Sequence, residues 1–475
     1  MPPRDHGVAP PHGRPDRSAI AAVLSALSAQ FGNRLATSPA VRQQHANTAT
    51  WVENQPPDAV VFAHTADEVV SIVTVCARHR VPVIPYGTGT SLEGHVNAPR
   101  GGVSIDLSGM NRVVAVHPED LDCVVEPGVT RKQLNDYLRD QGVFFPIDPG
   151  ADASLGGMAA TRASGTNAVR YGTMRDNVLA LQVVLADGAL VRTGTRAKKS
   201  AAGYDLTRLL VGSEGTLGII TELTLRLYGI PEAIAAGVCP FQTVEGACNA
   251  TIAAIQSGLP LARIELLDAL QVRACNAYSR LTLPEVPMLF LEFHGTPASV
   301  REQSERFGEI ARECDGGPFE WATQPEDRNR LWQARHDAYW AARGLRTNAQ
   351  AIATDVCVPI SRLAECVVAT QRDIAASGLI CPIVGHVGDG NFHCQPMIDM
   401  KSPEEVEAAE AFMSRLVARA LAMEGTSTGE HGVGQGKMTY LQTEHGTGAL
   451  AAMAAIKRAL DPHNIMNPGK IVALD

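Results

Sequence analysis

Two histidines in one short glycine-rich segment could bind a metal ion. The segment IVGHVGDGNFHC at residues 383–394 places His386 and His393 seven positions apart. On one straight strand, that spacing would send the two imidazoles to opposite faces. The Gly-Asp-Gly run at residues 388–390 is typical of a hairpin turn, and a turn there can bring both imidazoles to one side.

A second segment offers the carboxylate that this pair lacks. In GTSTGEHGVG at residues 425–434, Glu430 and His431 lie among small residues that leave room for a ligand. Two histidines and one carboxylate suit Zn²⁺, Mn²⁺ or Fe²⁺ and leave coordination positions for a substrate. A lone histidine is more often a hydrogen-bonded structural residue. Two glycine-flanked clusters together favour a metal site formed by His386, His393 and Glu430.

Three further segments are rich in small residues. PYGTGTSLEGH at residues 85–95 follows a buried strand, and its glycines let backbone N–H groups approach a phosphate. An ordinary tight loop explains this segment alone equally well, because it is neither the GxGxxG fingerprint nor a P-loop. Residues 146–176 form a long stretch of Gly, Ala, Ser and Thr, and long loops of this kind are usually functional. The third segment, residues 211–221, places glycines at the entrance to a strand.

Composition limits the class of protein. A chain of 475 residues, 45% hydrophobic and 19% charged, predicts two or more domains with substantial cores. The net charge of −9 and the lack of a basic stripe exclude a nucleic-acid partner. Ten cysteines without CxxC pairs indicate reduced, mostly buried thiols in a cytoplasmic protein. We expect no secretory signal and no transmembrane segment, since the apolar run at residues 19–27 is too short to span a bilayer.

The order of predicted elements indicates an α/β region, followed by a region in which longer helices are interleaved with strands. A strand at residues 59–63, a helix beginning near Thr65 with Glu68 placed for a capping box, and a strand from Val81 form a βαβ unit. Two strands and a helix from about Thr130 follow, and Asp-Gly at residues 187–188 predicts a hairpin, so the sheet is mixed.

Longer alanine-rich helices begin after Pro231, where we place a domain boundary. They are interleaved with strands such as residues 287–295, and the last helix ends at the Asp461-Pro462 breaker. One face of that helix is expected to carry the apolar residues Leu450, Met453, Ile456 and Leu460.

Taken together, the three small-residue segments resemble the FAD-binding domain of the vanillyl-alcohol oxidase superfamily, the PCMH-type fold of type 4 FAD-binding oxidoreductases. HVGDGNFH, the later GEHG and TDVCVPISRL at residues 354–363 are similar to its branch of D-lactate dehydrogenases and glycolate oxidase subunits. The resemblance covers the chain from about Val41. It implies an α+β fold class, with a two-subdomain FAD-binding domain and an α+β substrate (cap) domain built on an antiparallel sheet.

The resemblance also gives expected domain bounds. Residues 1–56 would form an N-terminal tail and helical lead-in, and residues 57–231 the FAD-binding domain. Residues 232–425 would form the cap domain with the metal-binding motif. Residues 426–475 would return to the FAD domain and complete the active site.

Roles for individual residues follow from the same resemblance. It assigns His386, His393 and Glu430 to the metal and His431 as general base. It makes Asn391 a substrate contact, although Asn after Asp-Gly is equally at home in a turn. Arg335 would face the substrate carboxylate, where its planar fork suits bidentate pairing, although an arginine on such a helix is more often solvated.

For the flavin, the resemblance implies contacts from all three small-residue segments. The implied FAD-binding residues are Gly87, Thr88, Gly89, Thr90, Ser91, Pro149, Ser154, Gly157, Gly165, Thr166, Glu214, Gly218 and Ile220. Some relatives tether FAD through a histidine at the position of Thr90, so we expect the FAD of this chain to be non-covalent. His95 lies beyond that position and is expected to be a surface or supporting histidine.

The expected function is oxidation of D-lactate or a similar small D-2-hydroxy acid to the 2-oxo acid. Hydride would pass to FAD with the help of one divalent metal, Zn or Mn, and electrons would continue to a cytochrome or quinone-linked acceptor. D-2-hydroxyglutarate dehydrogenase and glycolate oxidase activities are alternatives, and a second substrate carboxylate would call for Arg343, Arg346 or Lys437. A metal-dependent hydrolase with a nucleotide-binding domain is the alternative from another class.

The place of the protein in the cell and its assembly are less constrained. We expect a cytoplasmic protein, either free or peripheral to an inner membrane. The oligomeric state stays open, with a homodimer among the options.

Overall fold

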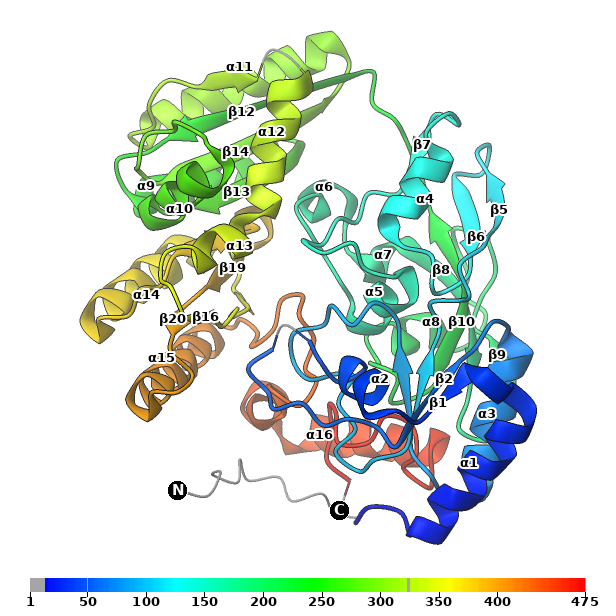
Figure 1. Cartoon of the computed structure of the whole chain (residues 1–475). Helices are drawn as coiled ribbons and strands as arrows, with labels where there is room; N and C mark the ends of the chain where they lie inside the picture. The colour runs from blue at the N-terminus through cyan, green and yellow to red at the C-terminus, as the bar shows by residue number, and fades with distance from the viewer. Residues whose placement is uncertain (1–12, 49, 323–324, 475) are drawn as a thin grey trace. The chain divides into compact units, whose positions relative to one another are not determined.

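A computed structural model describes residues 13–48, 50–322 and 325–474, which fall into two compact units (Figure 1). The first unit comprises residues 1–163, 173–229 and 430–475, and the second comprises residues 164–172 and 230–429. The first twelve residues of the expected N-terminal tail lie outside the described part of the chain.

A four-stranded sheet of the first unit contains the predicted βαβ unit. Its strand order is β1 (Leu35–Ala36), β2 (Ala59–Phe62), β4 (Val103–Asp106), β3 (Val83–Tyr86), with β2, β4 and β3 parallel. Helix α3 (Ala66–Arg78) connects β2 to β3, and Thr65 accepts from the Glu68 N–H at 3.2 Å. Only this half of the predicted capping box is present, because the Glu68 carboxylate accepts instead from the His64 N–H and from Arg34.

The second sheet of the first unit is antiparallel throughout. Its order is β5 (Val113–His117), β6 (Asp122–Val125), β10 (Ile219–Arg226), β8 (Val178–Val184), β9 (Leu190–Arg192). The hairpin predicted from Asp-Gly is the β8–β9 turn, where Gly188 has φ +85°. A two-stranded sheet pairs β7 (Val143–Phe144) with β11 (Tyr228–Gly229).

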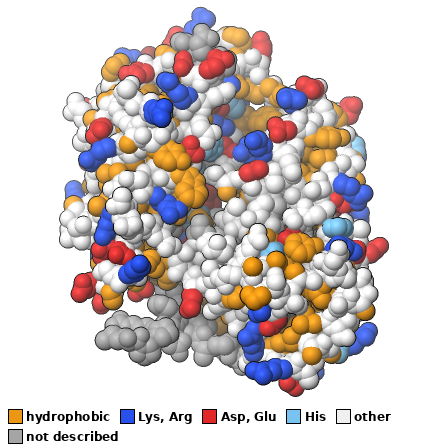
Figure 2. Space-filling view, viewed as in Figure 1, with side chains coloured by type: hydrophobic (Ala, Val, Ile, Leu, Met, Phe, Trp, Pro, Cys, Tyr) orange, Lys and Arg blue, Asp and Glu red, His pale blue; other side chains and the backbone are white. Residues whose placement is uncertain are grey.

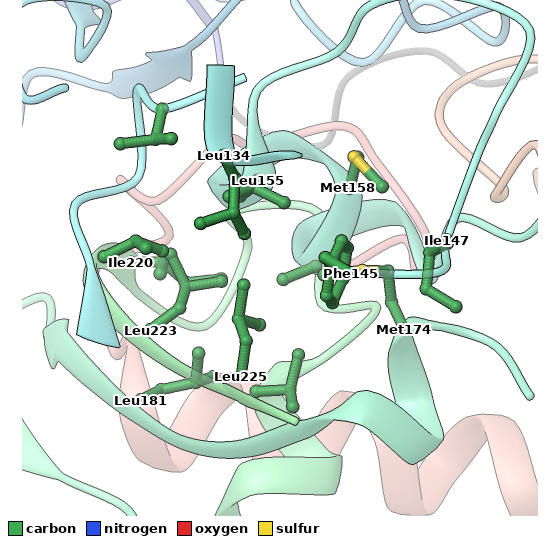
Figure 3. Packing of buried hydrophobic residues seen from close by; sticks show 14 of the residues in the cluster. Leu134, Phe145, Ile147, Leu155, Met158, Met174, Leu181, Ile220, Leu223 and Leu225 are labelled. Atoms are coloured by element: carbon green, nitrogen blue, oxygen red, sulfur yellow. The ribbon is translucent and has the colours of Figure 1, made fainter. Parts of the chain in front are cut away.

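One hydrophobic core ties this sheet to the helices beside it (Figure 3). Leu223 of β10 packs in one cluster with Leu155 and Met158 of α5 (Leu155–Thr161), and all three are almost fully buried. Each such side chain contributes about 1.5–3 kcal/mol by leaving water. The start of α5 is therefore fixed against the sheet. The other helical segments of the first unit are α1 (Arg17–Phe31), η1 (Gly32–Arg34), α2 (Pro39–Gln44), α4 (Arg131–Leu138), α5 (Leu155–Thr161), α7 (Met174–Asn177), α8 (Leu206–Leu210), η4 (Met438–Tyr440) and α16 (Leu441–Leu460).

The C-terminal segment returns to the first unit, as expected. Met466 forms a parallel bridge with Val83 of β3. Of the predicted apolar face of α16, Leu450, Met453 and Leu460 are half-buried, but Ile456 is exposed and its neighbour Lys457 is buried instead. The ammonium group of Lys457 binds the Asp461 carboxylate and donates to the carbonyls of Thr216 and Met466. Helical periodicity alone could not identify a lysine that is buried by satisfying three acceptors.

A seven-stranded antiparallel sheet forms the centre of the second unit. The strand order is β15 (Glu320–Ala322), β12 (Ala233–Pro240), β14 (Met288–Gly295), β13 (Leu261–Leu267), β18 (Ile383–Gly385), β19 (Asn391–Cys394), β17 (Val356–Cys357). This agrees with the antiparallel sheet expected for the cap domain. The short helix α6 (Ala168–Tyr171) joins this unit, although its sequence lies inside the small-residue stretch of the first.

Helices cover both faces of this sheet. Phe293 of β14 contacts Phe307 of α11 on one face, whereas Phe290, three positions earlier, contacts Trp332 of α12 on the other. The second face carries a core shared with α10 and α13. The helices and small strands of the unit are α9 (Val244–Gln256), α10 (Ala269–Ser279), α11 (Pro297–Glu313), α12 (Pro325–His336), α13 (Ala338–Arg343), β16 (Gln350–Ala351), η2 (Ile360–Arg362), α14 (Leu363–Ser377), η3 (Val387–Asp389), β20 (Met397–Ile398) and α15 (Pro403–Ala422).

The cysteines and the surface charges agree with what the composition predicts. All ten cysteines are free, and burial raises the pKa of the Cys76 thiol to about 12. On the face drawn in Figure 2, basic and acidic side chains are interspersed. Within the described ranges, every helix is too short or too polar to cross a membrane.

Asp268 at the start of α10 predicts a pH-dependent stability. Burial raises the pKa of this carboxyl to about 7, against an ordinary value of 3.8. Between these values the unfolded chain loses a proton that the folded chain keeps, so stability falls as pH rises from about 4 to about 7. Asp268→Asn keeps an N-cap oxygen. It should therefore gain stability relative to the parent from pH 5 to pH 7, by up to about 1.4 kcal/mol per pH unit.

Urea unfolding at pH 5, 6, 7 and 8 measures this difference. The matched control is Asp205→Asn at the exposed N-cap of α8, where the backbone N–H and side chain of Arg208 lower the carboxyl pKa. The Asp205 carboxylate contributes its full stability above about pH 5. The difference in unfolding free energy between Asp205→Asn and the parent should therefore not vary over this range. An Asp268→Asn difference that is equally constant contradicts the prediction.

Candidate functional site

The hairpin predicted between the two histidines is present. Strands β18 and β19 pair antiparallel, with Val384 opposite His393, and η3 forms the turn. Gly390 has φ +77°, and a Cβ there would lie 2.1 Å from the Val358 carbonyl oxygen, so only glycine fits. The rings of His386 and His393 are 5.5 Å apart, and their nearest ligand atoms lie within 4.8 Å of one another.

The hydrogen bonds of both imidazoles determine which nitrogen can bind a metal. His393 Nδ1 lies 2.9 Å from the Thr354 carbonyl oxygen, and His386 Nδ1 lies 2.9 Å from Glu265 Oε1. A carbonyl or carboxylate oxygen only accepts, so each Nδ1 carries the hydrogen and each Nε2 carries the lone pair. Two neutral imidazoles presented through Nε2 form a donor set that fits a divalent transition metal.

Glu265 lies between one of these histidines and Arg335. Its side chain is about 1% exposed, and its Oε2 lies 2.8 Å from Arg335 Nε and 2.6 Å from Nη2. Arg335 itself is buried, so the alternative of a solvated arginine on the helix surface is wrong. The ion pair uses the Nε and Nη2 edge of the guanidinium. Nη2 is buried without a hydrogen-bond partner among the described residues, so the predicted pairing with a substrate carboxylate can use Nη2 together with Nη1.

Asn391 is held by a second buried carboxylate. Its amide nitrogen donates to Asp355 Oδ1 at 2.7 Å and to the Val356 carbonyl at 2.8 Å. Asp355 Oδ2 accepts from the Thr428 hydroxyl at 2.9 Å. With both amide hydrogens used, Oδ1 is the atom through which Asn391 could contact a substrate, and that contact stays a prediction.

No role for Glu265 or Asp355 follows from the sequence motifs. A signal for Glu265 exists in LARIELL, where Arg263 and Glu265 alternate along an otherwise apolar strand and so share one face. Asp355 lies in the TDVC stretch that carried the family resemblance. Its burial and its distance of 3.7 Å from His393 Nδ1 place it beside the histidines.

The segment that leads to Glu430 is anchored in the second unit. Thr426 pairs with Cys357 of β17 through backbone hydrogen bonds. A Cβ on Gly429 would lie 2.3 Å from Asn391 Nδ2 and 3.1 Å from Asp355 Oδ1. Glu430 and His431 follow Gly429 directly and begin the last segment of the first unit. Their roles as metal ligand and base stay predictions.

The first two predicted FAD segments meet within the first unit. The Ser154 N–H at the start of α5 donates to Thr88 Oγ1 at 3.4 Å, and a Cβ on Gly87 would lie 2.2 Å from Ser154 Oγ. Gly89 has φ +65°. Among the described residues, the buried hydroxyl oxygen of Ser91 has no hydrogen-bond partner. A close-packed glycine loop with an unsatisfied hydroxyl fits a phosphate-bearing ligand.

Apart from Glu214, the remaining predicted FAD residues fall into three groups. Gly165 and Thr166 belong to the second unit, so they are not placed relative to the first loop. Gly218 is required by packing, since its Cβ would lie 2.4 Å from Val183 Cγ1, and Ile220 is part of the core. These two could meet FAD only through their backbone. Pro149 and Gly157 stay predictions without further support.

Glu214 uses its carboxylate to hold the C-terminal segment. It accepts from the N–H groups of Val433 at 2.7 Å and Gly434 at 2.8 Å, and His95 Nε2 lies 3.3 Å away. Burial opposes ionisation, but His95 and the two N–H groups together hold the Glu214 pKa below its ordinary value. His95 is buried, so the expectation of a surface histidine is wrong, and the supporting role stays a prediction.

Two family models match the chain. The model for the C-terminal domain of FAD linked oxidases matches residues 230–471, and the model for an FAD binding domain matches residues 57–194. The second range contains the two loops that meet at Thr88 and Ser154. The predicted metal-binding motif at residues 383–394 and most of the C-terminal segment lie in the first range.

The chain is also similar to proteins named as D-lactate dehydrogenases. It is 52% identical over 461 residues to "Probable D-lactate dehydrogenase, mitochondrial" of Danio rerio, which covers 96% of this chain and 93% of that protein. It is 51% identical over 416 residues to "D-lactate dehydrogenase (cytochrome), mitochondrial" of Arabidopsis thaliana. This match covers 88% of this chain and 73% of that protein.

A solved structure of p-cresol methylhydroxylase with substrate bound establishes the fold. It matches with a TM-score of 0.80 at 18% identity, over 96% of this chain and 98% of that one. The fold is a PCMH-type FAD-binding domain with a substrate domain built on a large antiparallel sheet, as expected.

The expectation of a cytoplasmic protein, free or peripheral to an inner membrane, is wrong. The similar proteins of Danio rerio and Arabidopsis thaliana are both mitochondrial by name. The expectation rested on unpaired cysteines. Free thiols occur in every compartment that keeps them reduced, so cysteine usage could not separate these locations.

Gly429→Ala is expected to destabilise the protein, because the new methyl group would collide with the Asp355–Asn391 pair. Overpacking of this kind lowers the free energy of unfolding by about 1–3 kcal/mol. The matched control is Gly448→Ala within α16, where a Cβ meets nothing within 4 Å. The control should not lower the midpoint, since a Cβ on Gly448 meets nothing and this residue follows the non-helical Gly446 by only two positions. Thermal denaturation of both variants checks this, and equal midpoints contradict it.

Proposed function

The chain belongs to the family of FAD-linked oxidases, and from that premise we propose that it is a metal-dependent D-lactate dehydrogenase. It would oxidise D-lactate, or a similar small D-2-hydroxy acid, to the 2-oxo acid. The single observation that carries the metal dependence is the imidazole pair, whose Nδ1 atoms are both bound to acceptors. The substrate is supported by the identity of about half of all aligned residues with proteins named for D-lactate.

Bound FAD supplies the hydride acceptor, and a bound Zn or Mn ion supplies Lewis acidity at the substrate hydroxyl. For the metal, we assign His386 and His393 with Glu430. For FAD, we assign the loop from Gly87 to Ser91 and the start of α5 at Ser154. Thr90 cannot form the histidine tether of some relatives, so the FAD is non-covalent.

Each remaining residue has a task that its contacts allow. Arg335 pairs with the substrate carboxylate through Nη1 and Nη2 while its Nε stays on Glu265. His431 takes the hydroxyl proton as hydride leaves the neighbouring carbon. Asn391, fixed by Asp355, offers Oδ1 to the substrate.

The partners of three basic residues favour a substrate with one carboxylate. Arg346 is bound bidentately by Glu405, whose pKa it lowers to about 2. The guanidinium of Arg343 lies over the Trp340 ring, and Lys437 forms an ion pair with Glu93 at 3.4 Å. Arg346 and Lys437 are thus held by carboxylates of the chain, whereas the exposed Arg343 keeps its N–H donors. This supports D-lactate over D-2-hydroxyglutarate.

Glycolate is the second candidate substrate. It lacks only the methyl group of lactate, so a glycolate oxidase activity stays possible for the same site. A metal-dependent hydrolase is not retained, since both family models describe FAD proteins.

A cytochrome is the proposed electron acceptor. The similar protein of Arabidopsis thaliana carries that word in its name, and this supports the proposal. A quinone-linked carrier is the second candidate for this role.

Anaerobic flavin reduction tests the proposed function. D-lactate should bleach the flavin absorbance, whereas L-lactate should leave it unchanged and D-2-hydroxyglutarate should act at least about tenfold more slowly. Chelation should stop the bleaching, and added Zn²⁺ or Mn²⁺ should restore it. Bleaching by glycolate alone would transfer the proposal to glycolate oxidase, and bleaching by none of these acids contradicts it.

His431→Ala is expected to reduce D-lactate-dependent flavin reduction by about 100-fold or more, since a general base contributes that much. FAD and metal contents should match the parent. His445→Ala, at a partly exposed histidine of the same C-terminal segment, is the control and should react at the parental rate. A His431 variant that reduces flavin as fast as this control removes the proposed base.

A further inference from the structure

We propose that Glu265 is a positioning residue that holds the metal-binding and substrate-binding parts of the site in one arrangement. The inference rests on the proposed function of His386 and Arg335. One carboxylate contacts both: Oε1 lies 2.9 Å from His386 Nδ1, and Oε2 lies within 2.8 Å of Arg335 Nε and Nη2.

The position of Glu265 in the sheet makes this arrangement rigid. Glu265 lies on β13 opposite Phe290 of β14, and β18, which leads into His386, pairs with the other edge of β13. Arg335 reaches the same carboxylate from α12. Three elements therefore meet at one side chain, and its two oxygens set the distance between histidine and arginine.

The charge of Glu265 is needed as well as its shape. A carboxylate fully removed from water is strongly destabilised unless charged or hydrogen-bonding partners surround it. Arg335 provides the opposite charge and His386 the hydrogen bond. In return, an ionised acceptor at Nδ1 raises the basicity of Nε2, as carboxylates behind metal-binding histidines do.

Glutamine at this position can satisfy only one of the two partners. Its amide oxygen can accept from His386 or from Arg335, but its NH₂ group would then face a donor on the other side. Glu265→Gln should therefore weaken Zn²⁺ or Mn²⁺ binding about 10–100-fold, or raise the KM for D-lactate by a similar factor, or both. Glu265→Asp keeps both acceptors but is one methylene shorter, so it should lie between the parent and Glu265→Gln.

The neighbouring strand offers a matched control. Glu292 of β14 is also buried, and its Oε1 lies 2.7 Å from Nε2 of His294 and 3.6 Å from Nε of Arg263. Neither His294 nor Arg263 has a proposed part in the reaction. Glu292→Gln should lower the thermal midpoint comparably but leave metal affinity and the KM unchanged.

The experiment uses the FAD-loaded full chain. Zn²⁺ affinity is measured by competition with a chromophoric chelator and Mn²⁺ affinity by electron paramagnetic resonance, both without turnover. The KM and kcat for D-lactate are measured separately on metal-saturated protein. Retained FAD and a cooperative thermal transition identify the folded variants. If Glu265→Gln does not fold, Glu265→Asp takes its place in the comparison.

The outcomes separate this inference from the proposed function. If the parent binds neither ion, the metal part of the proposed function fails and the inference with it. If the parent binds a metal and Glu265→Gln matches it within twofold in both affinity and KM, only the inference is overturned. A loss in the Glu265 variants that Glu292→Gln does not share supports it.

Discussion

The site depends on which nitrogen of each imidazole carries its hydrogen. At His393 a backbone carbonyl makes that choice, and at His386 a buried carboxylate makes it. Neither acceptor can exchange roles, so both lone pairs stay on Nε2. Without these two acceptors, each ring could present either nitrogen, and a pair of histidines at this spacing would not be a defined ligand set.

The antiparallel sheet of the second unit supplies both acceptors. Strand β13 brings Glu265, the β18–β19 hairpin brings the histidines, and β17 follows directly after Thr354 and Asp355. The same face of β13 also carries Leu267 in the core with α10 and α13. An apolar core at one end of the strand thus supports a polar site at the other, where the buried carboxylates of Glu265 and Asp355 both have partners.

Sequence patterns predicted the parts of this structure that depend on local chemistry. The β18–β19 turn and the β8–β9 hairpin could be predicted because glycines there adopt positive φ. The start of α3 at Thr65 could be predicted because the threonine side-chain oxygen caps the helix. Burial of Lys457 and the pairing of Glu265 with Arg335 could not be predicted, because they join residues whose proximity only the tertiary fold creates. No sequence pattern predicted that residues 164–172 belong to the second unit, since they lie within the small-residue stretch at residues 146–176 and nothing in the composition marks them off.

The Glu214 contact has a consequence for the order in which the chain folds. The first unit is assembled from segments that are far apart in the sequence, and Glu214 binds the backbone of Val433 and Gly434. During synthesis, those partners leave the ribosome after the whole second unit. The second unit can therefore form early, whereas the first unit stays incomplete until Val433 and Gly434 have been synthesised. A flavin site that needs the complete first unit would therefore form only after the second unit has been synthesised.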